Sequence, residues 1–149
     1  YPKHKAIHEL FAEQAGRTPG RMAATGRGQG AGGRVCHLSY GELNEKSDQL
    51  ARILRGKGVQ PDNIVGIMLE NSVEMIIGVL GILKAGGAYL PIDPDYPLER
   101  IIYMLSDSGA KVLLKKSEIR ISKSETNPND QNSNDQNKDN VLRCRGHMF

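Results

Sequence analysis

The chain has 149 residues and a formal net charge of +3, from 20 lysines and arginines against 17 aspartates and glutamates. This balance gives no basic face for nucleic acid and no reason to expect an anionic membrane as partner. The opening residues lack an apolar stretch of signal-peptide length, and the longest apolar run is interrupted by Glu74 and Lys84, so we predict no export signal and no membrane span.

Cysteine usage indicates a reducing compartment. The two cysteines, Cys36 and Cys144, lie far apart in the chain, so we predict no structural disulfide and a cytoplasmic protein. The chain begins with Tyr1 instead of Met, which suggests that it was cut from a longer one.

The first third of the chain predicts a short outer helix and a hairpin. Ile7, Leu10 and Phe11 recur at helical spacing. A weak strand at residues 22–25 and a return strand at 35–38 enclose a glycine-rich segment, which we interpret as a loose hairpin tip.

The clearest helix by local signals spans residues 39–58. Ser39 and Glu42 have the spacing of a capping box, and one apolar stripe follows them. The next apolar run, at residues 64–69, has strand length without alternation, as expected of a central parallel strand that is covered on both faces.

A second and strongly apolar helix is predicted to end near Lys84. Asn71 and Glu74 suggest its N-terminal cap. Gly78 and Gly81 lie three residues apart, so we expect them to leave one side of the helix bare for close packing on a strand.

Residues 83–100 organise the fold, because a helix ends, a short strand runs and a new helix starts within them. The pair Gly86-Gly87 suits a helix C-terminus. Three prolines limit the strand that follows, and Pro97 suits the first turn of the next helix. That helix carries an apolar stripe and precedes a last strand at residues 111–114.

The alternation of helices and strands predicts an α/β fold, namely a partial three-layer α/β architecture with a mostly parallel sheet. We assign residues 1–116 to a partial domain and 117–149 to a disordered, low-complexity tail. Residues 122–140 contain no apolar side chain and cannot bury surface to offset the entropy lost on ordering. Within the tail, Ile119 and Ile121 could extend a strand.

A glycine motif suggests a dinucleotide, but a simpler interpretation is available. Gly28, Gly30 and Gly33 spell the dinucleotide-binding fingerprint, which needs a helix N-terminus after it to meet the pyrophosphate. Here a predicted strand follows, so we favour a flexible loop.

The candidate metal ligands form two pairs and two single residues: Cys36 and His37, Cys144 and His147, His4, and His8. A structural zinc site needs four ligands on a folded frame. Because Cys144 and His147 fall in the predicted tail, we expect no metal site, and we expect both single histidines to be solvated residues of a surface helix.

Carboxylates cluster where the predicted strand at residues 88–92 ends. Asp93 and Asp95 flank a proline, Glu99 follows four residues later, and paired carboxylates can act as general acid and base. Aspartates also turn chains and acidic groups favour helix N-termini, which is the interpretation we prefer. We expect Tyr89 and Tyr96 to be partly buried packing residues.

Three segments together resemble a known family: residues 10–19 (LFAEQAGRTP), 38–54 (LSYGELNEKSDQLARIL) and 65–101 (VGIMLENSVEMIIGVLGILKAGGAYLPIDPDYPLERI). In order and spacing they are similar to the start of the adenylation domains of nonribosomal peptide synthetases, in the AMP-forming synthetase/ligase superfamily. The resemblance covers about residues 7–114 and departs at 21–34, where a glycine-rich insertion replaces a tighter turn.

The resemblance implies an enzyme that uses ATP and Mg²⁺ to convert an amino acid to an aminoacyl adenylate and then passes it to the phosphopantetheine thiol of a carrier-protein domain. It also implies that the phosphate loop, the substrate pocket and the catalytic lysine follow the matched segment. We therefore predict an N-terminal piece of an adenylation domain that holds no catalytic, cofactor-binding or metal residue and is inactive alone. The alternatives are a non-catalytic interaction module or vestigial fragment, and an unrelated nucleotide-binding α/β domain.

Overall fold

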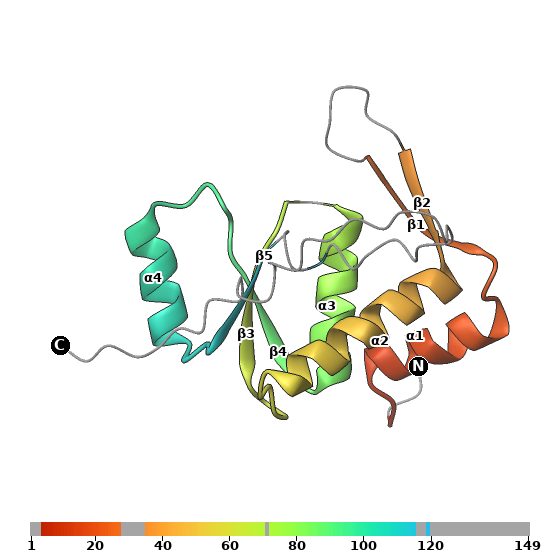
Figure 1. Cartoon of the computed structure of the whole chain (residues 1–149), viewed down its shortest axis with the longest axis horizontal. Coiled ribbons are helices and arrows are strands. Elements are labelled where there is room, and N and C mark those ends of the chain that lie inside the picture. Colours follow the sequence, from red (N-terminus) through yellow and green to blue (C-terminus); the bar gives the residue numbers. More distant parts are fainter. Residues whose placement is uncertain (1–3, 28–34, 71, 116–118, 120–149) are drawn as a thin grey trace, which may run out of the picture.

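The structure is a computed structural model that describes residues 4–27, 35–70, 72–115 and 119 (Figure 1). In chain order its elements are α1 (Ile7–Arg17), β1 (Met22–Arg27), β2 (Val35–Ser39), α2 (Tyr40–Gly56), β3 (Ile64–Met68), α3 (Val73–Ala85), β4 (Ala88–Pro91), α4 (Leu98–Asp107) and β5 (Val112–Lys115). The predicted order of helices and strands is confirmed.

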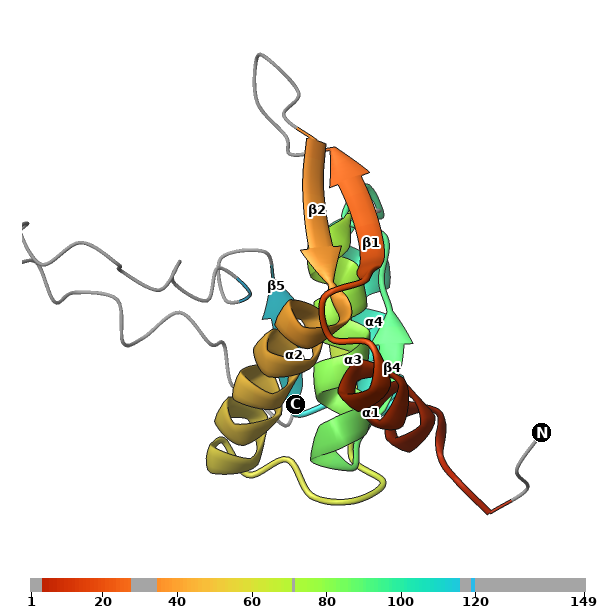
Figure 2. The same ribbon diagram turned by 90° about the vertical axis from the view of Figure 1, so that its right-hand side faces the viewer.

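The predicted hairpin is present as β1 and β2, which pair antiparallel with an irregularity between Met22 and Ala24. Figure 2 shows this hairpin projecting above the N-terminal part of α2, into which β2 leads directly. The glycine motif at Gly28, Gly30 and Gly33 falls between the two strands and lies outside the described residues.

A three-stranded parallel sheet in the order β4-β3-β5 forms the centre of the molecule. Val65 of β3 is in register with Tyr89 of β4 and with Val112 of β5. The apolar run predicted to be a central parallel strand is therefore β3, and its middle residues are buried as expected.

Helices cover the two faces of this sheet and give the predicted three layers (Figure 1). On one face α3 packs on β3, because a Cβ atom added to Gly78 would lie only 2.7 Å from Ile67 Cδ1. On the other face the Leu105 side chain of α4 lies over Gly66, where an added Cβ would be 2.9 Å from Leu105 Cδ2. Successive residues of β3 thus face opposite layers, as strand geometry requires.

The second helix glycine has a different neighbour from the one predicted. A Cβ added to Gly81 would lie 2.7 Å from Leu50 Cδ2, so Gly81 allows close approach of α2 and not of a strand. The expectation that both glycines pack on a strand is wrong for Gly81, because three residues along a helix turn a side chain by about 300° and bring it to another neighbour.

Local capping signals place the helix ends. The Ser39 backbone N–H donates to Glu42 Oε2 (2.8 Å) and the Glu42 N–H donates to Ser39 Oγ (3.2 Å), so the predicted capping box of α2 is confirmed. For α3 the N-cap is Ser72, one residue after the predicted Asn71, which lies outside the described residues. At the other end of α3, Gly86 takes the left-handed conformation with φ of 92°.

The core continues beyond the predicted domain boundary at residue 116. Ile119 is buried among the core residues, next to the position that a Gly78 Cβ would occupy. It has helical conformation, so it does not extend a strand. The remainder of the predicted tail, with Ile121, Cys144 and His147, lies outside the described residues.

Candidate functional site

A pocket of about 510 Å³ lies at the carboxyl ends of β3 and β4. Its lining residues come from the last residue of β4 and from the segments that follow the two strands: Leu69, Glu70, Met75, Pro91, Ile92, Asp93, Pro94, Asp95 and Tyr96. Because ligands of open α/β sheets bind outside the carboxyl ends of the strands, this pocket is the first place to look for a binding site.

The two aspartates of this pocket are arranged as turn residues. The Asp95 backbone N–H donates to the Asp93 carboxylate (2.9 Å), and the Tyr96 N–H donates to the Asp93 carbonyl (3.2 Å). Glu99 lies in the first turn of α4, where a negative charge complements the helix dipole. The preferred interpretation of these carboxylates as turn and helix-start residues is thus supported.

The two tyrosines differ in their surroundings. Tyr96 is half-buried, and the Arg100 guanidinium lies over its ring at 4.1 Å from the ring centre. Tyr89 is 44% exposed, so the expectation of a partly buried residue is wrong there. It sits on β4, which has a neighbouring strand on one side only among the described residues.

The charge of this pocket does not suit a nucleotide. Glu70, Asp93 and Asp95 line it, and none of its described lining residues is Lys or Arg. Carboxylates repel the phosphates of ATP, which proteins hold with cations or with clustered backbone N–H groups. Among the described residues, no group of three or more His, Cys, Asp or Glu side chains is placed so that it could hold a metal ion.

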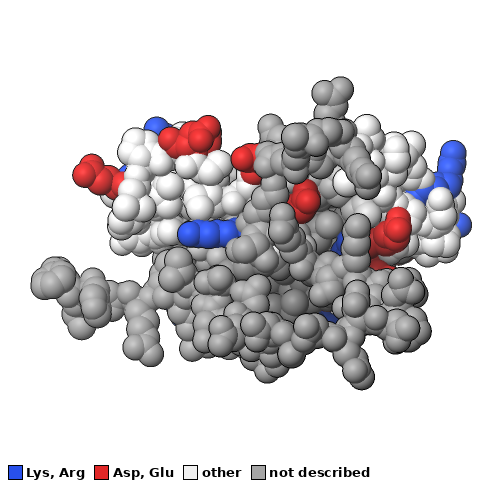
Figure 3. Space-filling view, turned by 45° about the horizontal axis from the view of Figure 1, so that its top comes forward, with Lys and Arg blue, Asp and Glu red and all other residues white. Residues whose placement is uncertain are grey.

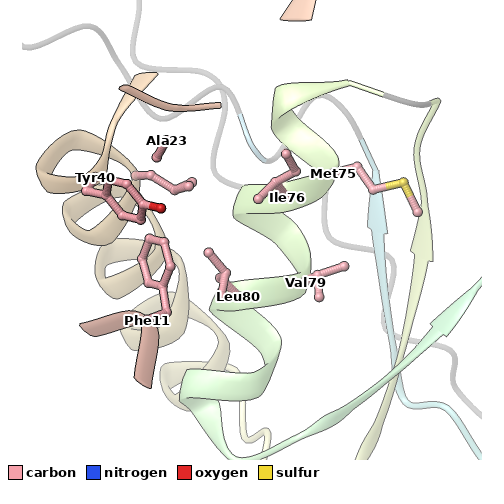
Figure 4. Close-up of a pocket in the computed structure, with 8 residues that line it drawn as sticks. Phe11, Ala23, Tyr40, Met75, Ile76, Val79 and Leu80 are labelled. Carbon is pink, nitrogen blue, oxygen red and sulfur yellow. The ribbon is translucent and has the colours of Figure 1, made fainter. Parts of the chain in front are cut away.

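A second pocket, of about 410 Å³, lies between α1, β1, α2 and α3. Figure 4 shows Phe11 and Tyr40 on one side of it and Ile76 and Leu80 of α3 on the other. The Phe11 and Tyr40 rings are 5.7 Å apart between centroids. Its lining is apolar apart from the Tyr40 hydroxyl, so it has few groups that could orient a polar substrate.

The ammonium of Lys84 is a buried charge with several partners. Its side chain is only 8% exposed, and it forms an ion pair with Asp48 Oδ1 at 2.8 Å. It also donates to Asn44 Oδ1 (2.7 Å) and to the Asn44 carbonyl (3.2 Å). Three acceptors match the three donors of an ammonium, so the buried charge is fully satisfied.

This lysine joins helices that are far apart in the sequence. Asn44 and Asp48 lie on α2, Lys84 lies in the last turn of α3, and the centre of the Phe11 ring of α1 lies 5.7 Å from the Lys84 nitrogen. Arg55 of α2 adds a hydrogen bond to the Lys84 carbonyl. The sequence showed Lys84 only as a residue near the end of a helix, because its partners lie 36 and 40 positions away.

The remaining candidate ligands are scattered. Cys36 is exposed on β2, and His37 beside it lies 3.2 Å from the Thr25 hydroxyl. His4 precedes α1 and is exposed, as predicted, but His8 on α1 is half-buried. Within the described part of the chain, none of the helices is both long and apolar enough to cross a bilayer.

Helices α2 and α3, which Lys84 joins, lie largely within the segments that resemble a known family. The AMP-binding enzyme family matches residues 11–145 of the chain. The chain belongs to this family. The family match runs past Leu114, where the resemblance noted in the sequence stops, and it removes the alternative of an unrelated nucleotide-binding domain.

Within the AMP-binding family, the chain is similar to peptide synthetases. It is 58% identical over 121 residues to bacitracin synthase 3 of Bacillus licheniformis. The aligned region covers 81% of this chain and 2% of the synthase. It is 50% identical over 113 residues to zwittermicin A synthase ZmaJ of Bacillus cereus, covering 76% of this chain and 20% of the synthase. The chain thus spans a small part of the length of these relatives.

Solved structures agree with this placement. FmoA3, a nonribosomal peptide synthetase solved with α-methyl-L-serine-AMP, has a TM-score of 0.69 and 37% identity, over 78% of this chain and 12% of its own. The N-terminal subdomain of NpsA from Klebsiella oxytoca has a TM-score of 0.62 and 28% identity, over 80% of this chain and 29% of its own. The chain is therefore the N-terminal portion of an adenylation domain related to those of nonribosomal peptide synthetases.

Proposed function

We propose that the chain serves as the N-terminal framework of a cytoplasmic amino-acid adenylation domain and does not catalyse adenylation by itself. One observation carries the proposal: the pocket at the carboxyl ends of β3 and β4 is lined by three carboxylates and by no cation among its described residues. The 8%-exposed Lys84 is engaged with Asn44 and Asp48 and is not directed to this pocket.

The reaction proposed for the complete domain needs strong stabilisation of phosphate charge. The amino-acid carboxylate attacks the α-phosphorus of ATP, the bond to the β-phosphate oxygen breaks, and pyrophosphate leaves. In the second step a carrier phosphopantetheine thiol attacks the carbonyl carbon and AMP leaves. Positioning and cationic or N–H groups lower the barrier of such phosphoryl chemistry.

The described residues of this pocket do not fit the phosphates of ATP, and no group of three or more His, Cys, Asp or Glu side chains among the described residues is placed to hold Mg²⁺. The rim of the pocket is acidic, and the carboxylate of Asp93 already accepts a hydrogen bond within its own turn. We therefore assign ATP, Mg²⁺, the amino acid and the carrier domain to the complete protein and no step of the reaction to residues of this chain.

Amino-acid-dependent exchange of labelled pyrophosphate into ATP tests this proposal. The purified 149-residue chain, supplied with a mixture of the 20 amino acids, ATP and Mg²⁺, is expected to show no exchange above the enzyme-free blank. A complete adenylation domain cloned from bacitracin synthase 3 is the positive control. Exchange by the chain that depends on an added amino acid would overturn the proposal.

A non-catalytic interaction module is the second candidate, and one observation favours it. Large apolar side chains of α4 are exposed, among them Leu98, Ile102 and Tyr103. A surface of this kind suits association with another protein segment.

A further inference from the structure

Residue 84 is held by α2 through both its side chain and its backbone. The Lys84 ammonium donates to Asn44 and Asp48, and the Lys84 carbonyl accepts a hydrogen bond from Arg55 in the last turn of α2. The acceptors are themselves fixed, because Ser47 Oγ donates to the Asn44 carbonyl (2.9 Å) and Asn44 Nδ2 donates to Asp48 Oδ2 (3.2 Å). The last turn of α3 is therefore attached to α2 at two points.

The chain passes from this turn into β4 through a short and crowded connection. Gly86 is left-handed, and its carbonyl accepts a hydrogen bond from the loop before β3. The Ala88 N–H at the start of β4 donates to the Asn63 carbonyl (2.9 Å). A Cβ added to Gly87 would lie 3.0 Å from the same carbonyl, so the connection has little room to adjust. The position of Lys84 thus determines where β4 begins.

The start of β4 in turn determines where one wall of the larger pocket lies. The strand has four residues and runs in register from Ala88 opposite Ile64 to Pro91 opposite Ile67. A slip of one residue would turn every side chain of the strand to the other face. Pro91 and the turn after it line the pocket of about 510 Å³ at the carboxyl ends of β3 and β4. Holding the start of β4 therefore also holds the wall of this pocket.

We propose that Lys84 is a positioning residue: by holding the end of α3 on α2, it keeps β4 in register on β3 and thereby shapes the pocket at the carboxyl ends of these strands. The strand β5 provides an internal reference, because it pairs with β3 on the other side and follows α4 in the chain. This role of Lys84 is independent of the proposed function, since it requires only the packing of α2, α3 and β4.

Charges on the surface of the molecule provide a matched control. Figure 3 shows acidic and basic side chains interspersed on the visible face, with neither sign forming a continuous patch over the described residues. Exposed charges of this kind are screened by water and salt, and contribute little. The Lys84 side chain is only 8% exposed, so its contacts with α2 are screened less. Substitution of Lys84 should therefore have a larger local effect than substitution of the exposed Lys111.

Amide hydrogen exchange of the full 149-residue chain, followed by NMR for each residue, tests this role in the wild type, Lys84→Met and Lys111→Met. The amides of Ala88 and Ile92, which donate to Asn63 and Ile67, report on β4. The measured quantity is the exchange rate of these amides relative to those of β5, because a loss of global stability raises both rates equally.

In Lys84→Met, the β4 amides are expected to exchange about 10-fold or more faster relative to β5 than in the wild type, because the end of α3 and β4 open locally. Lys111→Met should leave the ratio unchanged. Arg55→Met removes only the hydrogen bond to the Lys84 carbonyl and alters an exposed side chain, so it keeps the test usable if Lys84→Met does not fold. It is expected to change the ratio in the same direction by about 3-fold.

The pocket itself has a reporter in the Asp95 amide, which donates to the Asp93 carboxylate (2.9 Å). Its NMR signal is expected to move in Lys84→Met and to stay in place in Lys111→Met. A β4 to β5 ratio that is unchanged in Lys84→Met and Arg55→Met would overturn the proposal, because Lys84 would then contribute to global stability alone. An Asp95 signal that does not move in Lys84→Met would overturn the connection between Lys84 and the pocket.

Discussion

Helices α3 and α4 both connect parallel strands of the same sheet, yet they differ completely in burial. Seven of the residues of α3 are buried, including Ile82 at 0% exposure, whereas α4 has none. The layer of α3 is closed from outside by α2, while α4 meets the sheet through Leu105 over Gly66. Among the described residues, one face of the sheet is thus well covered, whereas the helix on the other face has no buried residue.

Two glycines of α3 allow its neighbours to pack closely against it. Gly78 allows Ile67 of β3 to approach on one side, and Gly81 allows Leu50 of α2 to approach on another. Close approach on two sides buries Leu80 and packs Val79 against the core, and these are the two residues between the glycines. Helix α4 has no glycine, and none of its residues is buried by the described part of the chain.

The largest expected effect compares the same substitution on the two helices. Ile82→Ala on α3 removes a fully buried side chain and is expected to lower the free energy of unfolding by about 2–4 kcal/mol. Ile102→Ala on α4 is expected to change it by less than about 0.5 kcal/mol, because that side chain is already exposed. Urea denaturation of both variants measures the difference, and equal losses would remove the distinction between the two helices.

Filling the bare side of α3 is the next test. Gly81→Val would place Cβ within 3.0 Å of three atoms of Leu50, so we expect a loss of about 2–3 kcal/mol in the free energy of unfolding. Gly56→Ala at the end of α2 is the matched control, since an added Cβ there meets nothing within 4 Å. The control should be neutral or stabilise by up to about 1 kcal/mol. Unchanged stability of Gly81→Val would show that α2 and α3 are not closely packed.

The polar anchor of the closed layer has a smaller expected effect. Lys84→Met keeps the length of the side chain but removes its hydrogen bonds to Asn44 and Asp48, and we expect a loss of about 1–2 kcal/mol. Asp48 is 43% exposed, so water can solvate it in the variant and moderate the loss. Lys111→Met, at an exposed position, is the control. Thermal unfolding measures both variants, and equal midpoints for the two would contradict the anchoring role of Lys84.

The smallest effect concerns how the helices begin. Hydrogen bonds from the backbone and hydroxyl of Ser39 lower the pKa of Glu42 below its ordinary value of 4.5, whereas α4 begins at Pro97 without a side-chain cap. Because the folded-state pKa lies below the unfolded value, this contribution is present above about pH 4.5 and is lost as the pH falls through the folded-state pKa.

Thermal unfolding of the wild type and of Glu42→Gln from pH 7 to pH 3 measures this contribution. The wild type is expected to be slightly more stable at pH 7, by at most about 2 °C in the midpoint, and the difference should shrink toward pH 3. Glu99→Gln on α4 is the control, and an equal pH-dependent change there would contradict the assignment to the α2 cap.

Features set by neighbouring residues were predictable from the sequence. The capping box of Ser39 and Glu42 and the left-handed Gly86 depend on a few adjacent positions, so the ends of α2 and the C-terminus of α3 lie close to where they were predicted. The short length of β4 likewise follows from its prolines.

Features set by tertiary packing were not predictable. The partners of Lys84 lie on another helix, and the neighbour of Gly81 depends on how α2 crosses α3. The apolar stripe of α4 correctly predicted a helix, but a stripe carries no information on whether its cover belongs to the same chain. The turn role of the pocket residue Asp93 was anticipated, while the exposure of Tyr89 on β4 was not.

Amide hydrogen exchange of the chain alone, resolved to the peptides of α3 and α4, tests most directly whether one face of the sheet is complete and the other is not. The account predicts that the α3 amides exchange only through global unfolding, and that the α4 amides exchange about 10-fold or more faster through local opening. Equal protection of the two helices would contradict it, because α4 would then be held as firmly as α3 without a further cover.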